Sequence, residues 1–317
     1  MASCVPVEDG TCHTPRNLPH APGPDALLLL RTPAVTDTPT GEPRAGETVV
    51  ERRADVDRTP VTWHEAPSTG APVLYLHGVP TNGEDWLPFL ERTGGVAPDL
   101  PGFGRSGKPP HFDYSIDGYR RFLEAFLDHL EVDRLSLVVH DWGGVGLALA
   151  QAAPERIERL VVINCVPLLP GYRWHRIARV WRTPVIGEMA MGFTTRWGAR
   201  QLSREAVVAP GPAPREFVDR VWRHFDHGTQ RAILRLYRSA PPAVLEAAGA
   251  RLGEIRCPAL VLWGVEDPYI ATSFATAYAE RLGGPTALEL VDGASHWPWI
   301  DRPETIDRVA GFLRAGA

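Results

Sequence analysis

Residues 138–144 read Val-Val-His-Asp-Trp-Gly-Gly, and this stretch determines how the rest of the chain is interpreted. An apolar run that begins at Leu135 ends at the charged Asp141. Two glycines follow at once, and then a stretch from Val145 to Ala153 with the composition of a helix. We therefore expect a buried strand, a tight turn that leaves no room for side chains at the glycines, and a helix.

Four other stretches also place polar or glycine-rich loops after short apolar runs. They read Val-Leu-Tyr-Leu-His-Gly-Val-Pro at 73–80, Pro-Asp-Leu-Pro-Gly-Phe-Gly-Arg-Ser-Gly at 98–107, Leu-Val-Leu-Trp-Gly-Val-Glu-Asp at 260–267 and Gly-Ala-Ser-His-Trp-Pro-Trp-Ile-Asp-Arg-Pro at 293–303. Apolar runs of this length, bounded by turn residues, are typical of buried strands.

Periodicity along the chain predicts that strands alternate with helices. The opening strands, 48–56 and 61–65, are expected to form an antiparallel pair with Pro60 in the turn between them. Residues 117–130 carry apolar side chains at helix spacing. Such alternation predicts a mostly parallel central sheet flanked by helices, with right-handed crossovers. Further strands are expected at 73–77, up to Asp99, at 134–140, 157–164, 258–263 and 287–291, and a closing helix at 304–313.

The alternation breaks between Val166 and about Pro242. This stretch has no clear strand, several helical patterns and a Pro-Gly-Pro-Ala-Pro interruption at 210–214. We interpret 166–242 as a helical cap inserted after the sixth strand, with the core formed by 47–165 and 243–317. The cap carries 13 arginines against five acidic residues, a balance that we assign to solvated helix faces rather than to an anion funnel.

The remaining bulk properties exclude several kinds of partner. Residues 1–46 hold eight prolines and no apolar run longer than Leu27–Leu30, so we expect a disordered tail without a leader or a membrane span. The net charge of −5 argues against a nucleic-acid partner. The four cysteines lack metal-ligand spacing, so we expect no metal site; we interpret Cys165 and Cys257 as reduced core residues, which fits a cytoplasmic location.

In their order and spacing, these motifs resemble the α/β-hydrolase superfamily, in its aspartate-nucleophile branch of epoxide hydrolases and haloalkane dehalogenases. The resemblance covers roughly residues 48–317 and implies an α/β-hydrolase fold whose cap covers the active site. Most members place a serine where this chain has Asp141, in a strained turn between strand and helix. A carboxylate there can displace a leaving group from saturated carbon and form an ester.

The resemblance implies a catalytic triad in the chain order Asp141, Asp267 and His296. Asp141 would be the nucleophile, although helix N-capping is the commoner role of such an aspartate. His296 would activate water, and Asp267 would orient it. The pattern Trp-Gly-x-x-Asp favours Asp267 over its neighbour Glu266, which we interpret as a solvated side chain. Asn164 stands where some relatives carry the acid, but it cannot ionise.

The backbone N–H groups of Val79 and Trp142 are expected to form the oxyanion hole. A haloalkane dehalogenase also needs N–H donors around the departing halide, and the Trp142 indole offers one. The second donor is often an Asn at the position of Val79, which has no polar side chain. Some relatives use a cap tryptophan instead, for which the candidates here are Trp174, Trp181 and Trp197.

An epoxide hydrolase instead uses cap tyrosines to protonate the opening oxygen. Tyr237, in Leu-Arg-Leu-Tyr-Arg, resembles one of them, and Tyr172 is the available second. We therefore expect a cofactor-free epoxide hydrolase acting on a small-to-medium apolar substrate and water, with haloalkane dehalogenase as the alternative. A non-catalytic binding protein on the same fold is a more remote alternative, because all three triad residues are present. The oligomeric state stays open.

Overall fold

The computed structural model of the chain describes residues 49–68, 70–208 and 215–315. The predicted disordered tail at 1–46 and the proline-rich interruption at 210–214 lie outside the described residues.

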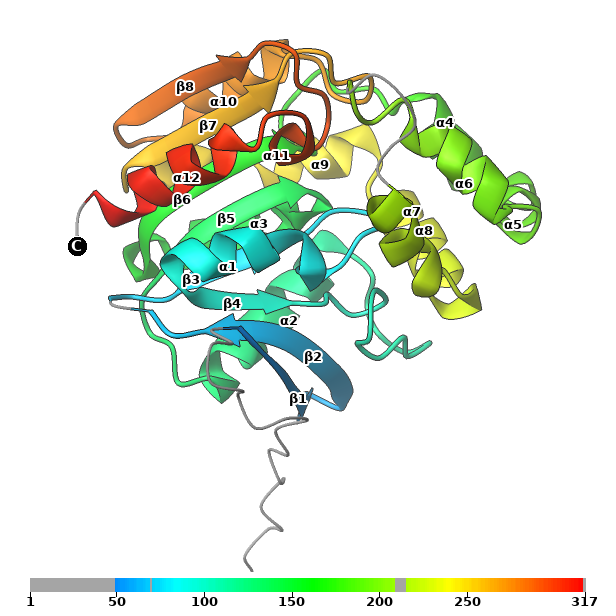
Figure 1. Ribbon diagram of the computed structural model, residues 1–317, viewed down its shortest axis with the longest axis horizontal. Helices are drawn as coiled ribbons and strands as arrows, with labels where there is room; N and C mark the ends of the chain where they lie inside the picture. The colour runs from blue at the N-terminus through cyan, green and yellow to red at the C-terminus, as the bar shows by residue number, and fades with distance from the viewer. Residues whose placement is uncertain (1–48, 69, 209–214, 316–317) are drawn as a thin grey trace, which may run out of the picture. The chain divides into compact units, whose positions relative to one another are not determined.

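Eight strands form one sheet in the order β1-β2-β4-β3-β5-β6-β7-β8 (Figure 1). The β1–β2 and β2–β4 pairs are antiparallel, and the remaining neighbours are parallel, so the prediction of a mostly parallel sheet is confirmed. The strands are Val50–Val56 (β1), Thr59–Ala66 (β2), Val73–Leu76 (β3), Gly95–Pro98 (β4), Leu135–Asp141 (β5), Ile157–Cys165 (β6), Ala259–Gly264 (β7) and Thr286–Val291 (β8).

The opening hairpin differs from the expectation that Pro60 lies in its turn. The turn consists of Asp57 and Arg58, both with positive φ (47° and 62°), as a two-residue hairpin turn requires. Pro60 lies inside β2, opposite Asp55. A proline is tolerated there because β2 pairs with β4 only from Trp63 onward, so at Pro60 the strand has a neighbour on one side only.

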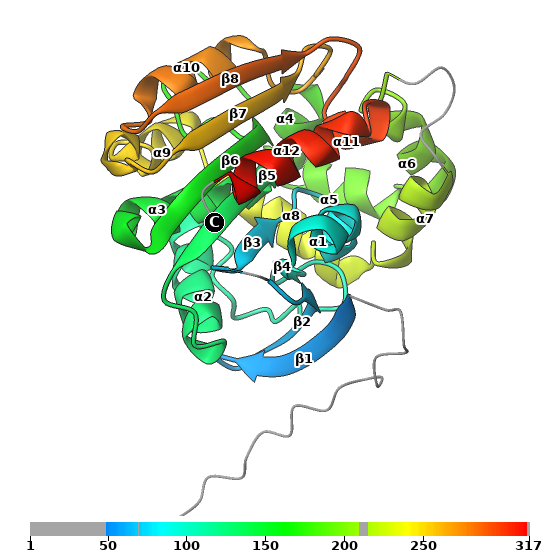
Figure 2. The ribbon, with the colours of Figure 1, turned by 60° about the vertical axis from the view of Figure 1, so that its left-hand side comes forward.

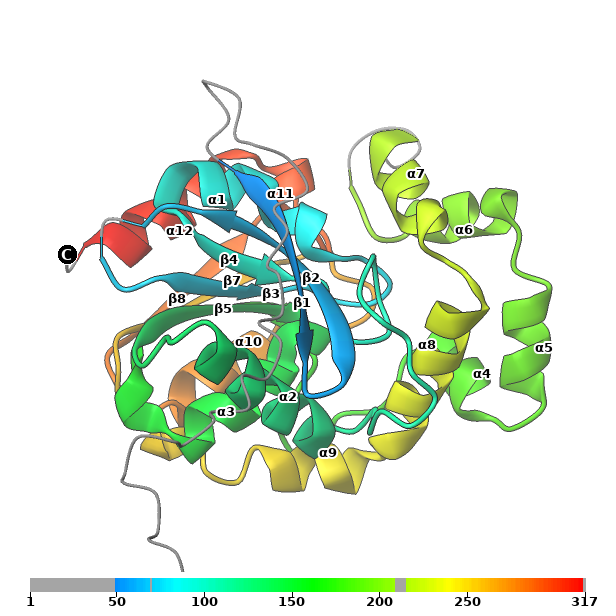
Figure 3. The same cartoon turned by 90° about the horizontal axis from the view of Figure 1, so that it is seen from below.

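Helices cover both faces of the sheet, which explains why all seven residues of β5 are buried. Figure 3 shows α1, α11 and α12 on one face, and α2, α3, α9 and α10 on the other; Figure 2 shows α1 and α12 in front of the sheet. The helices are Leu87–Thr93 (α1), Ile116–His129 (α2), Gly146–Ala152 (α3), Pro242–Ala248 (α9), Ser273–Arg281 (α10), Pro298–Asp301 (α11) and Glu304–Arg314 (α12).

Five more helices stand between β6 and β7, which we call the cap helices. Figures 1 and 3 show them beyond the arrowheads of the parallel strands, where the carboxyl ends of such strands place a binding site. Within the described part of the chain, no helix is long and apolar enough to cross a membrane. The cap helices are Arg176–Arg182 (α4), Ile186–Gly192 (α5), Arg196–Ser203 (α6), Arg215–Arg223 (α7) and His227–Ser239 (α8).

The chain leaves the core for the cap helices and returns to it at adjacent positions. Leu168 follows β6, and Gly249 ends α9 on the way to β7. A Cβ atom on Gly249 would lie only 1.7 Å from the carbonyl oxygen of Leu168. The two chain segments therefore touch, and only glycine fits at that contact.

Candidate active site

Asp141 occupies a strained turn between β5 and the short 3-10 helix Trp142–Val145. Its φ of 48° and ψ of −119° are unusual for a residue other than glycine. The turn is also crowded, because a Cβ on Gly143 would lie 2.1 Å from the Leu76 carbonyl oxygen, and one on Gly144 2.4 Å from Cys165 Sγ. The Asp141 side chain makes no helix-capping hydrogen bond, so N-capping does not account for it.

The two carboxylate oxygens of Asp141 have different surroundings. Oδ1 accepts a hydrogen bond of 2.8 Å from the backbone N–H of Val79. Oδ2 lies 3.5 Å from Nε2 of His296. The close approach of the Val79 loop requires Gly78, since a Cβ there would lie 2.4 Å from the Asp141 Cβ.

His296 is fixed from its other side by Asp267. Its Nδ1 lies 2.8 Å from Asp267 Oδ2. Oδ1 of Asp267 accepts from the backbone N–H groups of Tyr269 and Ile270 at 2.7 and 3.2 Å. Asn164 donates from Nδ2 to Asp267 Oδ2 at 2.8 Å, so it supports the acid instead of replacing it. The structure therefore brings together the three residues that the sequence analysis proposed as a triad.

The charges of His296 and the neighbouring carboxylates affect one another. Burial lowers the pKa of His296, but the charge of Asp267 and the hydrogen bonds to Asp141 and Asp267 outweigh burial and raise it to about 10. Burial raises the pKa of the Asp141 carboxyl, yet the hydrogen bond and charge of His296 leave it below 3.8. An imidazolium between two carboxylates is thus the favoured resting state.

Glu266 is exposed, but it is not simply a solvated neighbour as the sequence suggested. Its carboxylate accepts hydrogen bonds from the backbone N–H groups of Gly293 and Ala294 at 3.1 and 3.0 Å. These residues belong to the loop that leads to His296. Glu266 therefore holds this loop, while Asp267 contacts the imidazole itself.

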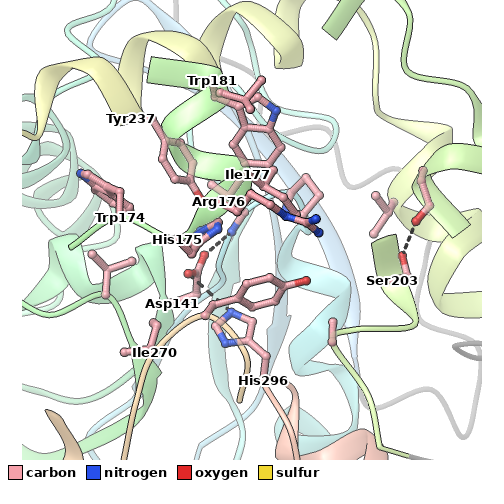
Figure 4. A pocket seen from close by; sticks show the side chains of 18 of the residues that line it. Asp141, Trp174, His175, Arg176, Ile177, Trp181, Ser203, Tyr237, Ile270 and His296 are labelled. Carbon is pink, nitrogen blue, oxygen red and sulfur yellow. Dashed lines mark hydrogen bonds and ion pairs between the residues drawn. The ribbon is translucent and has the colours of Figure 1, made fainter. Parts of the chain in front are cut away.

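A cavity of about 390 Å³ lies between the cap helices and the carboxyl ends of the strands (Figure 4). Its lining is mainly apolar, as is usual for a small-molecule site. The predicted binding residue Trp142 is not among the lining residues; it packs against two of them, with its ring stacked on Trp174 at 5.5 Å and edge-on to Tyr237 at 5.1 Å. Trp197 does not line the cavity, and its side chain is 71% exposed. The predicted residues that do line it are Val79, Asp141, Tyr172, Trp174, Trp181, Tyr237 and His296.

The N–H donors of the three buried or half-buried tryptophans differ in availability. Trp142 Nε1 is buried, and a hydrogen bond from Trp142 to the Tyr237 hydroxyl opposes the rise that burial causes in the pKa of Tyr237. Trp174 Nε1 already donates to the Ala240 carbonyl oxygen at 3.0 Å. Trp181 lies at the cavity wall, edge-on to Tyr237 at 5.1 Å. Of the cap candidates, only Trp181 is thus left to donate into the cavity.

His175 is a cavity residue that the sequence analysis missed. Its Nδ1 accepts from the backbone N–H of Ala178 at 3.4 Å, which leaves the proton of the neutral ring on Nε2. Burial lowers the pKa of His175 to about 4 despite the opposing charge of Asp141. Figure 4 shows His175 beside Asp141. A lone histidine in a helical stretch carries no spacing pattern, so the sequence offered nothing to identify it.

A second group missed from the sequence joins a cap helix to the His296 loop. Asp85, fully buried, contacts Arg220 of α7 at 2.8 Å and accepts from Trp297 Nε1 at 3.3 Å. Trp297 follows His296, and its ring lies edge-on to the imidazole at 4.6 Å. A buried acid in a short 3-10 helix has no sequence pattern either, because its partners are 135 and 212 residues away.

Comparison with known proteins agrees with this geometry. A haloalkane dehalogenase of Mesorhizobium japonicum is 35% identical over 80% of this chain and 87% of the relative. One of Mycolicibacterium paratuberculosis is 31% identical over 82% and 90%. The crystal structure of haloalkane dehalogenase DbeA from Bradyrhizobium elkani, 25% identical, superposes with a TM-score of 0.72 over 84% of this chain and 97% of that chain.

The family model described as "Alpha/beta hydrolase family" matches residues 73–309. That span includes every residue of the proposed triad and all the parallel strands. The chain is an α/β-fold hydrolase and belongs to the alpha/beta hydrolase family.

Proposed function

We propose that this hydrolase is a haloalkane dehalogenase, which converts a small apolar haloalkane and water into an alcohol, halide and a proton. The observation that carries the proposal is the buried indole of Trp142, the residue after Asp141, which packs against the cavity residues Trp174 and Tyr237. The relatives at 31–35% identity support the same activity. The order of preference from the sequence, with epoxide hydrolase first, is therefore reversed.

The first step is displacement at carbon. Asp141 Oδ2 attacks the carbon that bears the halogen, and the halide departs with the electron pair of the broken bond. Trp142 Nε1 donates to the halide as its charge develops. In the resting site this N–H has the neutral hydroxyl of Tyr237 as its partner, and a charged halide replaces it with a stronger hydrogen bond.

The second step is hydrolysis of the ester. Nε2 of His296 accepts a proton from water, and the hydroxide attacks Cγ of Asp141. The negative charge develops on Oδ1, where the Val79 N–H already donates at 2.8 Å; the Trp142 backbone N–H is the proposed second donor. The bond between Cγ and the alkylated oxygen then breaks, and His296 returns its proton to that oxygen to complete the alcohol. The proton of the regenerated Asp141 carboxyl passes to His296, which restores the resting imidazolium.

Ester formation itself prepares His296 for this role. In the resting site, the charge of Asp141 and its hydrogen bond help to raise the pKa of His296. Alkylation neutralises Asp141 and removes both contributions, so the pKa of His296 falls. The imidazolium then gives up its proton to solvent, which is the proton that the overall reaction releases. The neutral imidazole is therefore available as a base only after the ester exists.

The second halide donor must come from the cap, because Val79 has no side-chain N–H. Trp174 is occupied and Trp197 does not line the cavity; Trp181 does line it, but Figure 4 shows it farther from Asp141 than His175, whose pKa the charge of Asp141 affects. We assign the role to His175, whose neutral ring carries its proton on Nε2 beside Asp141.

Epoxide hydrolysis is the second candidate, favoured by the position of two tyrosines. Tyr172 and Tyr237 line the same cavity as Asp141. Burial, and to a lesser degree the charge of Asp141, raise the pKa of both hydroxyls, so that both keep their protons. Either hydroxyl could protonate the oxygen of an opening epoxide ring.

A paired assay separates the two activities. One arm follows halide release from 1-bromobutane and 1,2-dibromoethane; the other follows diol formation from styrene oxide and a trans-disubstituted epoxide. We expect halide release that falls about a hundredfold in Trp142→Phe and much less in Tyr237→Phe. Diol formation without halide release, lost in Tyr237→Phe, would instead establish the epoxide hydrolase.

A further inference from the structure

The cap helices expose a row of large apolar side chains. Val185, Ile186 and Met189 are 69%, 54% and 55% exposed. Phe193 and Trp197, at the end of α5 and the start of α6, are 78% and 71% exposed. Such a concentration of exposed apolar residues on neighbouring turns is unusual for a soluble surface and indicates a binding face. We call these five residues the apolar tip.

The spacing of three of these residues follows the period of a helix. Ile186, Met189 and Phe193 follow one another at three and four residues, which places them on one side of α5; Trp197 lies in α6, beyond the break between the two helices, and is exposed there. The other side of the same helices faces the cavity, through Ala190 and Ala199. Figures 1 and 3 both show α5 at the outer end of the cap helices, away from the sheet.

The charge around the apolar tip is opposite to that of the whole protein. Residues 176–204 hold six arginines and one acidic residue, Glu188, whereas the chain carries a net charge of −5. Two of these arginines, Arg176 and Arg196, are paired with Glu205 and Asp219, which lie outside this range. Glu188 is bound at 2.6 and 2.8 Å by Arg238 of α8, which fixes α5. Arg179, Arg200 and Arg204 have no acidic partner among the described residues.

We propose that the apolar tip docks the enzyme on an anionic lipid surface. Apolar and aromatic side chains would enter the interface between headgroups and acyl chains, and the arginines would contact the headgroup phosphates. We expected no membrane partner from the sequence, but that expectation concerned a spanning segment. Surface docking needs only an amphipathic face of this kind.

The shape and charge of the face favour lipid over a protein. The apolar side chains protrude from helix turns, so they suit a fluid surface that closes around them. A second copy of the chain would bring two arginine-rich faces together, and the like charges would repel. Docking would also place the cavity wall close to the bilayer, where apolar substrates concentrate; the proposal holds whichever bond the enzyme cleaves.

Vesicle co-sedimentation of the full chain tests the proposal. We expect binding to phosphatidylcholine vesicles that contain phosphatidylglycerol, weak binding to phosphatidylcholine alone, and release at high salt. Phe193→Gln/Trp197→Gln should lower the partition coefficient about tenfold or more. The matched control, Leu288→Thr/Leu290→Thr, changes two exposed apolar residues on β8, outside the apolar tip, and should bind vesicles as the unaltered chain does.

Thermal melting and turnover of a water-soluble substrate accompany the binding assay, because Phe193 and Trp197 do not line the cavity. Both should be unchanged in the Gln variant, which separates loss of docking from loss of folding or activity. Absence of sedimentation, or equal sedimentation of the Gln variant, would overturn the proposal. A dimer in sedimentation velocity that dissociates in the Gln variant would also overturn it, and would assign the face to a second copy.

Discussion

The two carboxylate oxygens of Asp141 have different roles in the proposed reaction. The oxygen held by Val79 has its hydrogen-bond donor in place before any substrate arrives. The other faces His296, on the side from which water would attack. Preorganisation of this kind lowers the barrier because no donor has to move when charge develops.

Removal of the base should separate the two proposed steps. In His296→Gln we expect one equivalent of bromide from 1,2-dibromoethane and then no further turnover, because the ester forms but water is not activated. Intact mass spectrometry should show the added bromoethyl group, and Asp141→Asn should show neither bromide nor adduct. Multiple turnovers by His296→Gln would contradict the assignment of the base.

The pH dependence of the intermediate follows from the charge on His296. Once Asp141 is esterified, the pKa of His296 lies below the value of about 10 in the resting site. Below that lowered pKa the imidazole is protonated and cannot accept a proton from water. We therefore expect the ester to accumulate in the steady state as the pH falls, measured by acid quench and mass spectrometry. A constant ester fraction across the acid range would argue against His296.

At the scale of elements, the contact between α7 and the core depends on a buried charge. Asp85→Asn removes the charge that Arg220 and Trp297 contact. We expect a loss of about 2 kcal/mol in the free energy of unfolding, measured by urea denaturation, and faster hydrogen exchange in α7. The control is Asp307→Asn, whose partner Arg92 is a surface residue; it should cost less than about 0.5 kcal/mol. Equal losses in the two variants would show that Asp85 has no special role.

Local sequence patterns were sufficient to predict the strands and helices but not to locate every turn. The strand-turn-helix at Asp141 was predictable, because an apolar run, an acid and two glycines fit only one local structure. The turn at Asp57 and Arg58 was missed, because Pro60 is the stronger turn residue by type. Pro60 is tolerated inside β2 because β2 has only one neighbouring strand at that position, and this depends on the assembled sheet and not on the local sequence.

For the whole molecule, two buried histidines should limit stability in acid. Burial lowers the pKa of His77 and of His140 from 6.5 to about 4. The unfolded chain therefore binds more protons between these values, and stability falls as the pH drops from 6.5 towards 4. Each residue should cost about 3 kcal/mol across this window. Unfolding free energies measured at several pH values should show this slope, and His140→Phe should reduce it; an unchanged slope would exclude His140.

The cavity was less predictable from the sequence than the fold, because its residues acquire their roles from contacts between distant parts of the chain. The proposed triad lies at the ends of strands, so its members follow from motifs in the right order. The roles of Trp174 and His175 depend on hydrogen bonds to Ala240 and Ala178 that only the packed cap helices define. The sequence therefore cannot tell that the N–H of Trp174 is already used while that of His175 can donate into the cavity.

The contact between Leu168 and Gly249 bears on how this enzyme could change its substrates. Because the chain returns through α9 to a point beside the one where it left, a longer, shorter or foreign insertion between Leu168 and the start of α9 costs the core little beyond the slow logarithmic growth of loop-closure entropy. Grafting the cap of another member onto these two positions is therefore a low-cost change. Selection could exchange the whole recognition surface in one recombination event while Asp141, Asp267 and His296 keep their geometry.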